Sequence, residues 1–218
     1  MRYQITVNLT APMVTYLFNN NYSLCVLKGV TSSVAGVPLI WFSTTSYQQS
    51  TAIVWDDELQ VYISSSAINA GSQIEMAATC PVPFDASVLI DDGKLFASGG
   101  GADGVNIVNG DSRVWTTGLC QSVDGSPNPI CATVLSADAY CGLSPASCVA
   151  LMFVQKMASV GTVVTNAPVP SVLVTMNGVP ASVTFDVTDN WIWDSGTTAQ
   201  AIDDGTDLCG PLVQVPPD

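Results

Sequence analysis

Histidine is absent from the 218 residues of this chain, and positive charge is scarce, with 5 Lys and Arg against 18 Asp and Glu. Without imidazole, the chain cannot form a Ser-His-Asp or Cys-His nucleophile system or an ordinary zinc or copper site. Its net charge of −13 opposes binding to nucleic acid, which requires clustered Lys and Arg. We therefore expect no catalytic residues, no enzymatic activity and no nucleic-acid partner.

Long apolar runs are missing as well. The residues 1–7 alternate between polar and apolar types like a strand, and they lack the apolar centre of a signal peptide. The longest apolar run, 148–154, is far shorter than the ~18 residues that a membrane helix needs. These features predict a soluble chain without a membrane span, which is either cytoplasmic or has already lost a leader.

The chain contains few charged residues but enough apolar ones for a core. Charged residues make up 11% of it, against about 25% in a typical globular protein, whereas the apolar share of 48% is ordinary. Its length fits one β-sandwich domain over 1–218. The Gly-rich segment 98–104 is the best candidate for a long loop or for a boundary between two smaller sandwich halves.

Apolar and polar residues alternate with a period of two over many short segments, which is typical of half-buried strands. Short strands without helical crossovers predict an all-β, antiparallel β-sandwich, and no segment shows a convincing helical pattern. The first three strands are expected at Tyr3–Leu9, Met13–Phe18 and Ser23–Val30. Later strands of the first half are expected at 39–45, 52–55 and 60–65.

Two Asn-Gly pairs predict hairpin turns, because this pair supplies the two positive-φ residues of a type I′ turn. Asn109-Gly110 would join strands at 105–108 and 112–116, and Asn177-Gly178 would join strands at 171–176 and 182–187.

Seven cysteines leave two interpretations open. One or two disulfides are expected if the chain is oxidised, with Cys120–Cys131 and Cys141–Cys148 as the local candidates. Alternatively, the thiols are reduced and pack as small hydrophobic side chains. The odd number requires at least one free thiol in a monomer.

Two tryptophan pairs are candidate ligand-binding residues. Alternation places Trp191 and Trp193 on one face of a strand, where two indoles would form a flat platform for a sugar or a planar ligand. Trp41 and Trp55 flank a polar loop that would line a pocket. In both cases the alternative is that the indoles belong to the core.

Acidic turns are the candidate metal ligands. Asp203, Asp204 and Asp207 place three carboxylates within five residues around a glycine, which suits Ca²⁺ or Mg²⁺. The alternative is a solvated turn, since Asp is favoured in turns. A covalently bound pigment would need an amine, and Lys28, Lys94 and Lys156 are equal candidates from the sequence.

The segments 16–22, 36–42 and 52–55 (YLFNNNY, GVPLIWF and AIVW) resemble a group of small fungal proteins from mushrooms that includes the pink chromoprotein of oyster mushrooms. The resemblance implies a coloured, non-enzymatic protein that holds a small conjugated chromophore, and it carries over no site residue. A carbohydrate-binding lectin is the alternative function, followed by a β-pore-forming protein. A homodimer is possible in each case.

Overall fold

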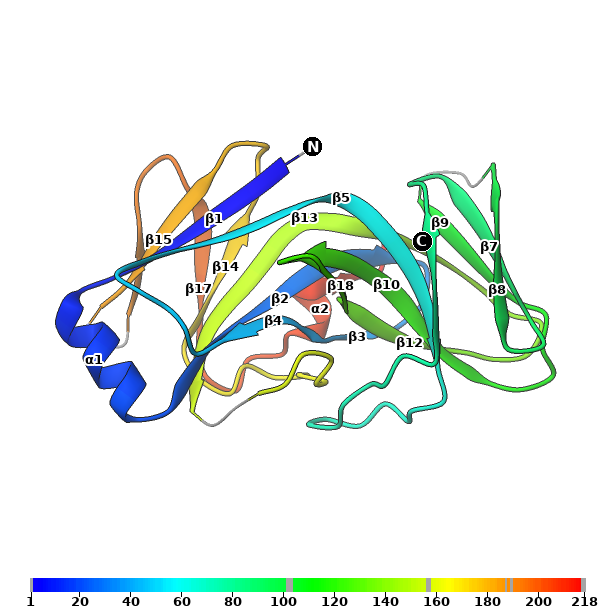
Figure 1. Cartoon of the computed structure of the whole chain (residues 1–218), viewed down its shortest axis with the longest axis horizontal. Coiled ribbons are helices and arrows are strands. Elements are labelled where there is room, and N and C mark those ends of the chain that lie inside the picture. Colours follow the sequence, from blue (N-terminus) through cyan, green and yellow to red (C-terminus); the bar gives the residue numbers. More distant parts are fainter. Residues whose placement is uncertain (1, 101–103, 156–157, 187, 189, 217–218) are drawn as a thin grey trace.

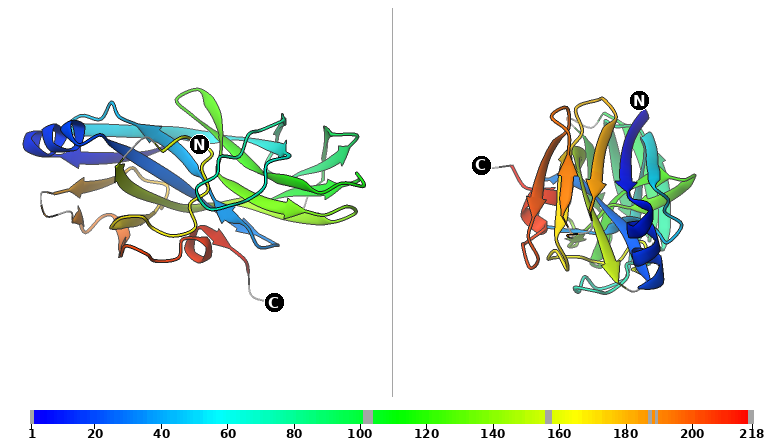
Figure 2. Two further views of the ribbon diagram at one scale, coloured as in Figure 1. Left: turned by 90° about the horizontal axis from the view of Figure 1, so that it is seen from below. Right: turned by 90° about the vertical axis from the view of Figure 1, so that its left-hand side faces the viewer.

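The computed structural model describes residues 2–100, 104–155, 158–186, 188 and 190–216. Two curved, mixed sheets face each other along an elongated molecule (Figures 1 and 2), which confirms the prediction of an all-β sandwich. The pairing is not wholly antiparallel, because β1 and β15, β7 and β9, and β2 and β18 pair in parallel.

The first sheet has the order β16 (Trp191–Trp193), β15 (Ala181–Phe185), β1 (Arg2–Leu9), β5 (Ser50–Ser64), β10 (Trp115–Val123), β12 (Cys131–Leu135) and β3 (Val37–Pro38). In addition, β6 (Ala78–Val82) pairs with β5, and β11 (Ser126–Pro129) pairs with β10. The strand predicted at 3–9 is confirmed as β1, and the strands expected at 52–55 and 60–65 belong to one long strand, β5.

The second sheet has the order β17 (Thr198–Ile202), β14 (Ser171–Thr175), β13 (Tyr140–Gln155), β9 (Val105–Asn109), β7 (Ala86–Asp91) and β8 (Lys94–Gly99). The strand β2 (Tyr22–Ser32) pairs with β13, β4 (Ile40–Thr44) and β18 (Val213–Gln214), and it confirms the strand predicted at 23–30. The long strands β2, β5, β10 and β13 arch through the middle of the molecule (Figure 1).

The strand predicted at Met13–Phe18 is wrong, because this segment lies in the helix α1 (Ala11–Asn19). The hydroxyl of Thr10 accepts a hydrogen bond from the Met13 amide at 3.3 Å, which caps the helix. Pro12 lies in the first turn, where its missing N–H costs nothing. Met13 and Leu17, four residues apart, are the buried side chains. A short second helix, α2, spans Cys209–Leu212.

Both predicted Asn-Gly hairpins are also wrong. The strands β14 and β15, on either side of Asn177-Gly178, belong to different sheets, and β9 pairs with β7 and β13 rather than with β10. Asn109 is fully buried, and its side-chain amide donates to three backbone carbonyls, those of Arg113, Leu135 and Ser136. Asn109 thus ties strand ends together instead of forming a tight turn.

The disulfide prediction is wrong in this structure, because all seven cysteines are free thiols. Most of them are buried among apolar side chains, and burial raises the pKa of Cys25 to about 11 and that of Cys131 to about 12. Such thiols are poor nucleophiles and pack as small hydrophobic residues. Among the described residues, no helix is long and apolar enough to cross a membrane.

Candidate functional site

A cavity of about 320 Å³ is lined by residues of both sheets. The first sheet contributes side chains from β1, β5 and β10, and the second sheet contributes side chains from β2 and β13. Its walls include Tyr3, Lys28, Trp55, Asp57, Gln121 and Met176. This volume lies at the lower end of the range of about 300–1,000 Å³ that small-molecule sites occupy.

A bulge in each sheet widens the space at this place. In the second sheet, Pro145 pairs with Val30 and Val149 with Lys28, so three residues of β13 lie opposite the single residue Gly29 of β2. In the first sheet, the partners of Gln121 and Val123 are Leu59 and Trp55, so 56–58 of β5 lie opposite one residue of β10. Bulges bend a strand and redirect side chains, and both bulged segments contribute to the wall of the cavity.

Gly29 permits the bulge in the second sheet. A Cβ atom at this position would collide with the sulphur of Cys148, and it would lie 3.3 Å from the Cβ of Ala146. The absence of a side chain therefore allows the bulged segment of β13 to lie directly against β2.

Lys28 is a charged residue at a core position. It shares the inward face of β2 with Leu24, Val26 and Val30, which all belong to the main hydrophobic core. Only 5% of its surface is exposed. Within the described part of the chain its ammonium makes no hydrogen bond or salt bridge; two indole rings lie beside it, with centroids 5.2 Å (Trp55) and 5.8 Å (Trp41) from Nζ.

Burial lowers the pKa of Lys28 to about 8, because the charged form loses hydration; nearby Cys148 and Asp57 act in the opposite direction and raise the pKa. About one tenth of the Lys28 amine is therefore neutral at pH 7, far more than of an ordinary lysine. Interaction with the indole faces stabilises the remaining ammonium form.

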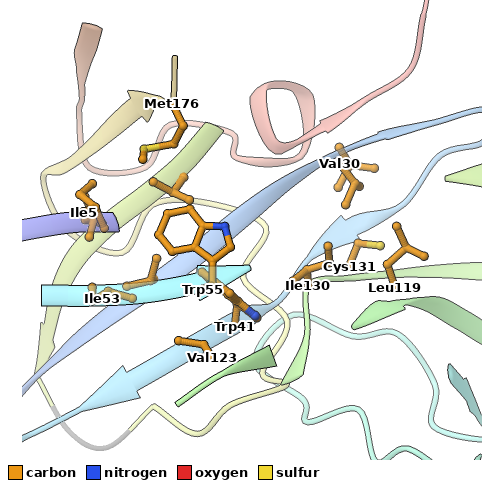
Figure 3. Packing of buried hydrophobic residues seen from close by; sticks show 14 of the residues in the cluster. Ile5, Val30, Trp41, Ile53, Trp55, Leu119, Val123, Ile130, Cys131 and Met176 are labelled. Atoms are coloured by element: carbon orange, nitrogen blue, oxygen red, sulfur yellow. The ribbon is translucent and has the colours of Figure 1, made fainter. Parts of the chain in front are cut away.

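Three aromatic rings pack together beside Lys28, and two of them, those of Tyr3 and Trp55, line the cavity. Trp41 and Trp55 meet edge to face with centroids 5.3 Å apart, and Figure 3 shows them adjacent in the core, with Met176 on the other side of Trp55. Tyr3 stacks on Trp55 at 5.6 Å and 15°. The Trp41 indole N–H donates to the backbone carbonyl of Gln121 at 2.8 Å, which fixes that ring. Of the first predicted tryptophan pair, Trp55 lines the cavity and Trp41 packs behind it.

Two buried polar atoms at this wall have no protein partner among the described residues. They are the indole nitrogen of Trp55, a donor, and the side-chain carbonyl oxygen of Gln121, an acceptor. The amide nitrogen of Gln121 donates to the backbone carbonyl of Asp56, which fixes the orientation of the amide group. Buried polar groups in proteins are almost always paired, so two unpaired ones at one cavity are unusual.

Asp57 lies on the bulge of β5 at the exposed side of the cavity. Its carboxylate is hydrogen-bonded to the Tyr3 hydroxyl. The pKa of Tyr3 is raised, first by burial and then by the charge and hydrogen bond of Asp57. Asp57 thus places a negative charge on the same cavity as Lys28 and orients the ring that stacks on Trp55.

The second tryptophan pair lies elsewhere and is not an exposed platform. Trp191 is 7% exposed, stacks on Phe153 at 5.8 Å, and donates its indole N–H to the carbonyl of Pro170 at 3.2 Å. Trp193 is partly buried against the same core, and Ile192 between them points outward. The predicted platform fails because the inward face of β16 packs on the core.

The predicted metal ligands do not come together. Asp207 accepts hydrogen bonds from the amides of Cys209 and Gly210, at 3.2 and 2.9 Å, and so pairs the first two amides of α2. Asp203 and Asp204 are exposed turn residues. Among the described residues, no group of three His, Cys, Asp or Glu side chains is arranged to hold a metal ion.

The structure ranks the three lysines, which the sequence left equal. Lys94 is exposed on β8, and Lys156 lies outside the described residues. Lys28 stands within the apolar run 24–30 on a single strand, and this position is a signal that sequence reasoning missed. Asp57 and Gln121 carried no comparable signal, because the two bulges that place them at the cavity depend on pairing between distant strands.

Comparisons with protein-family models, curated proteins and solved structures found no match for this chain. The resemblance to mushroom proteins therefore stays a prediction, and the function is argued from the cavity alone.

Proposed function

We propose that this protein is a non-enzymatic binding protein that holds a small, planar, conjugated molecule, a pigment, in the cavity beside Lys28. The observation that carries the proposal is the buried amine of Lys28 beside Trp41 and Trp55, at a cavity of ligand size. A charged group at a core position is unfavourable for folding, whereas a binding site needs a few polar groups on an apolar wall.

The shape and chemistry of the walls favour a flat ligand with a polar edge. An extended π system can contact the aromatic wall of Tyr3 and Trp55. The unpaired atoms of Trp55 and Gln121 lie beneath the accessible surface of this wall; a side-chain shift on binding would let the first donate a hydrogen bond to the ligand and the second accept one from it. The closely spaced Lys28 and Asp57 charges favour a ligand that is neutral or carries a single delocalised charge.

The lectin alternative has less support. A sugar site on Trp191 and Trp193 would need both indole faces accessible, and Trp191 lies in the core. No feature of the described residues specifically favours a β-pore-forming protein.

The first test is an absorbance spectrum of the protein isolated from its natural source. We expect a band beyond the tryptophan absorption that stays with the protein through gel filtration. A colourless preparation with no such band would contradict the pigment.

The second test uses ligand-free protein and a planar conjugated probe, 4-(dimethylamino)cinnamonitrile. Binding in the cavity should quench tryptophan fluorescence, because Trp55 lines it. Ser147 is an exposed residue at the cavity, so Ser147→Phe should weaken binding at least about tenfold by obstructing the entrance. Ser195→Phe makes the same change at an exposed turn away from the cavity and should leave binding unchanged. Equal binding by both variants would place the probe elsewhere.

A further inference from the structure

The amine of Lys28 is positioned to do more than contact a ligand. Resting on the function proposed above, we propose that Lys28 binds a conjugated aldehyde or ketone covalently, as an imine between its Nζ and the carbonyl carbon of the ligand. Lys28 lines the cavity, its ammonium lies beside the two adjoining indoles of Trp41 and Trp55, and no described residue engages it in a salt bridge or hydrogen bond.

Imine formation needs a neutral amine, and the environment of Lys28 provides it. Burial lowers the pKa of Lys28 to about 8, so at pH 7 its neutral fraction is about 300 times that of an ordinary lysine with a pKa of 10.5. Desolvated lysines in apolar pockets are the usual nucleophiles for carbonyl compounds. The titratable groups that act on this amine are Asp57 on β5 and Cys148 on β13, and Asp57 is itself bonded to Tyr3 on β1.

The reaction balances without an oxidant or another reactant. The lone pair of Nζ attacks the carbonyl carbon, and the carbonyl π electrons move to oxygen. One proton moves from nitrogen to that oxygen, which gives a carbinolamine. The hydroxyl then leaves with the second proton of the nitrogen as water, and a C=N double bond remains.

The surroundings suit the product as well as the reaction. Protonation of the imine would place a positive charge on a conjugated system, with the carboxylate of Asp57 at the same cavity to stabilise it. Delocalisation of that charge along the ligand lowers the energy of its electronic transition. The covalent bond would therefore both retain the ligand and deepen its colour.

The test uses 4-(dimethylamino)cinnamaldehyde, the aldehyde counterpart of the nitrile probe, with ligand-free protein at pH 7. Sodium cyanoborohydride traps any imine as a stable secondary amine, and peptide mapping by mass spectrometry locates it. We expect adduct formation at Lys28 about a hundredfold faster than at N-acetyl-lysine amide, in line with the difference in neutral amine. The N-terminal amine is the main competitor, and the peptide map separates it from Lys28.

One variant tests Lys28, and a second variant with the same change at an exposed lysine is its control. Lys28→Met should abolish the internal adduct and the red-shifted absorbance before reduction, whereas Lys94→Met, the same change at an exposed lysine, should alter neither. Circular dichroism checks that both variants fold. The peptide map of the unaltered protein decides the question even where Lys28→Met does not fold.

The outcomes separate the two proposals. A nitrile probe that binds, together with aldehyde adducts only at Lys94 or the N-terminus, would refute the imine and leave the binding cavity standing. Binding of neither the nitrile nor the aldehyde would refute the proposed function itself. Borohydride reduction of the naturally pigmented protein should fix the pigment to the Lys28 peptide, and release of all pigment on denaturation after reduction would overturn the inference.

Discussion

Lys28 should destabilise the ligand-free fold at neutral pH. Burial lowers its pKa from 10.5 to about 8, so the folded state binds this proton more weakly than the unfolded state does. The cost of folding with a lowered lysine pKa is greatest below the folded pKa, and it disappears as the pH rises through the unfolded pKa. Lys28→Met keeps most of the side-chain volume and removes the charge.

The magnitude follows from the two pKa values, 10.5 in the unfolded chain and about 8 in the folded protein. At pH 7 the lowered pKa destabilises the folded protein by about 3 kcal/mol, and at pH 9.5 by about 1 kcal/mol. Lys28→Met should therefore raise the free energy of unfolding by about 3 kcal/mol at pH 7 and by less than half of that at pH 9.5.

Urea unfolding followed by far-UV circular dichroism at pH 7, 8.5 and 9.5 measures the difference. Buried thiols complicate the absolute values, because the raised pKa values of residues such as Cys25 and Cys131 cost stability above pH 9. Both proteins share this effect, so it cancels when they are compared. Lys94→Met should change stability by no more than about 0.5 kcal/mol. A Lys28→Met protein that is less stable at pH 7, or a gain independent of pH, would refute the reasoning.

Three further predictions concern the framework. Trp191→Ala should lower the free energy of unfolding by about 3–5 kcal/mol, because it leaves a cavity in the core. It should not affect binding of the nitrile probe. A decrease below about 1 kcal/mol would show that the indole is not packed. Thr10→Ala should cost about 1 kcal/mol through the lost helix cap, measured by urea unfolding; no loss would argue against the cap. The pKa of Asp111 is lowered, first by the hydrogen bond from the Trp115 indole. The Asp111 carboxylate therefore stabilises the fold above its ordinary pKa, and this stabilisation is lost as the pH falls through its lowered pKa. Asp111→Asn should lower the melting temperature at neutral pH, and the difference from wild type should shrink in acid. A difference that does not change with pH would contradict this.

The β-rich fold could be predicted because period-two alternation is a local property of each strand. The alternation pattern gave a wrong prediction at 13–18. The spacing of Met13 and Leu17 fits a helix as well as a strand, and the cap at Thr10 favours the helix. The Asn-Gly turns failed because a turn propensity cannot specify which strands pair. β14 leads into a different sheet from β15, and only long-range packing determines that.

The candidate site could be predicted in part. Trp55 was identified as a ligand-binding candidate, and Trp41 lies directly behind it, because large aromatic residues near a polar loop are visible in the sequence. Trp191 carried the same signal and lies in the core, since burial depends on which face of β16 meets the other sheet. Asp57 and Gln121 reach the cavity through the bulge in β5, a feature of strand pairing that leaves no local pattern.

Several features that are unfavourable for folding coincide at this one cavity. Each sheet loses regular pairing there, a lysine occupies a core position, and the polar atoms of Trp55 and Gln121 lack protein partners. Away from the cavity, β5 pairs with β1 and β6 in regular register, and β2 has one further irregularity, against β4. Local departures from regular structure concentrate at functional sites, where the surrounding fold supplies the stability that they cost. A ligand that pairs the two orphan atoms and converts the Lys28 amine to an imine would relieve these departures together, so its binding should stabilise the protein more than its contact area alone predicts.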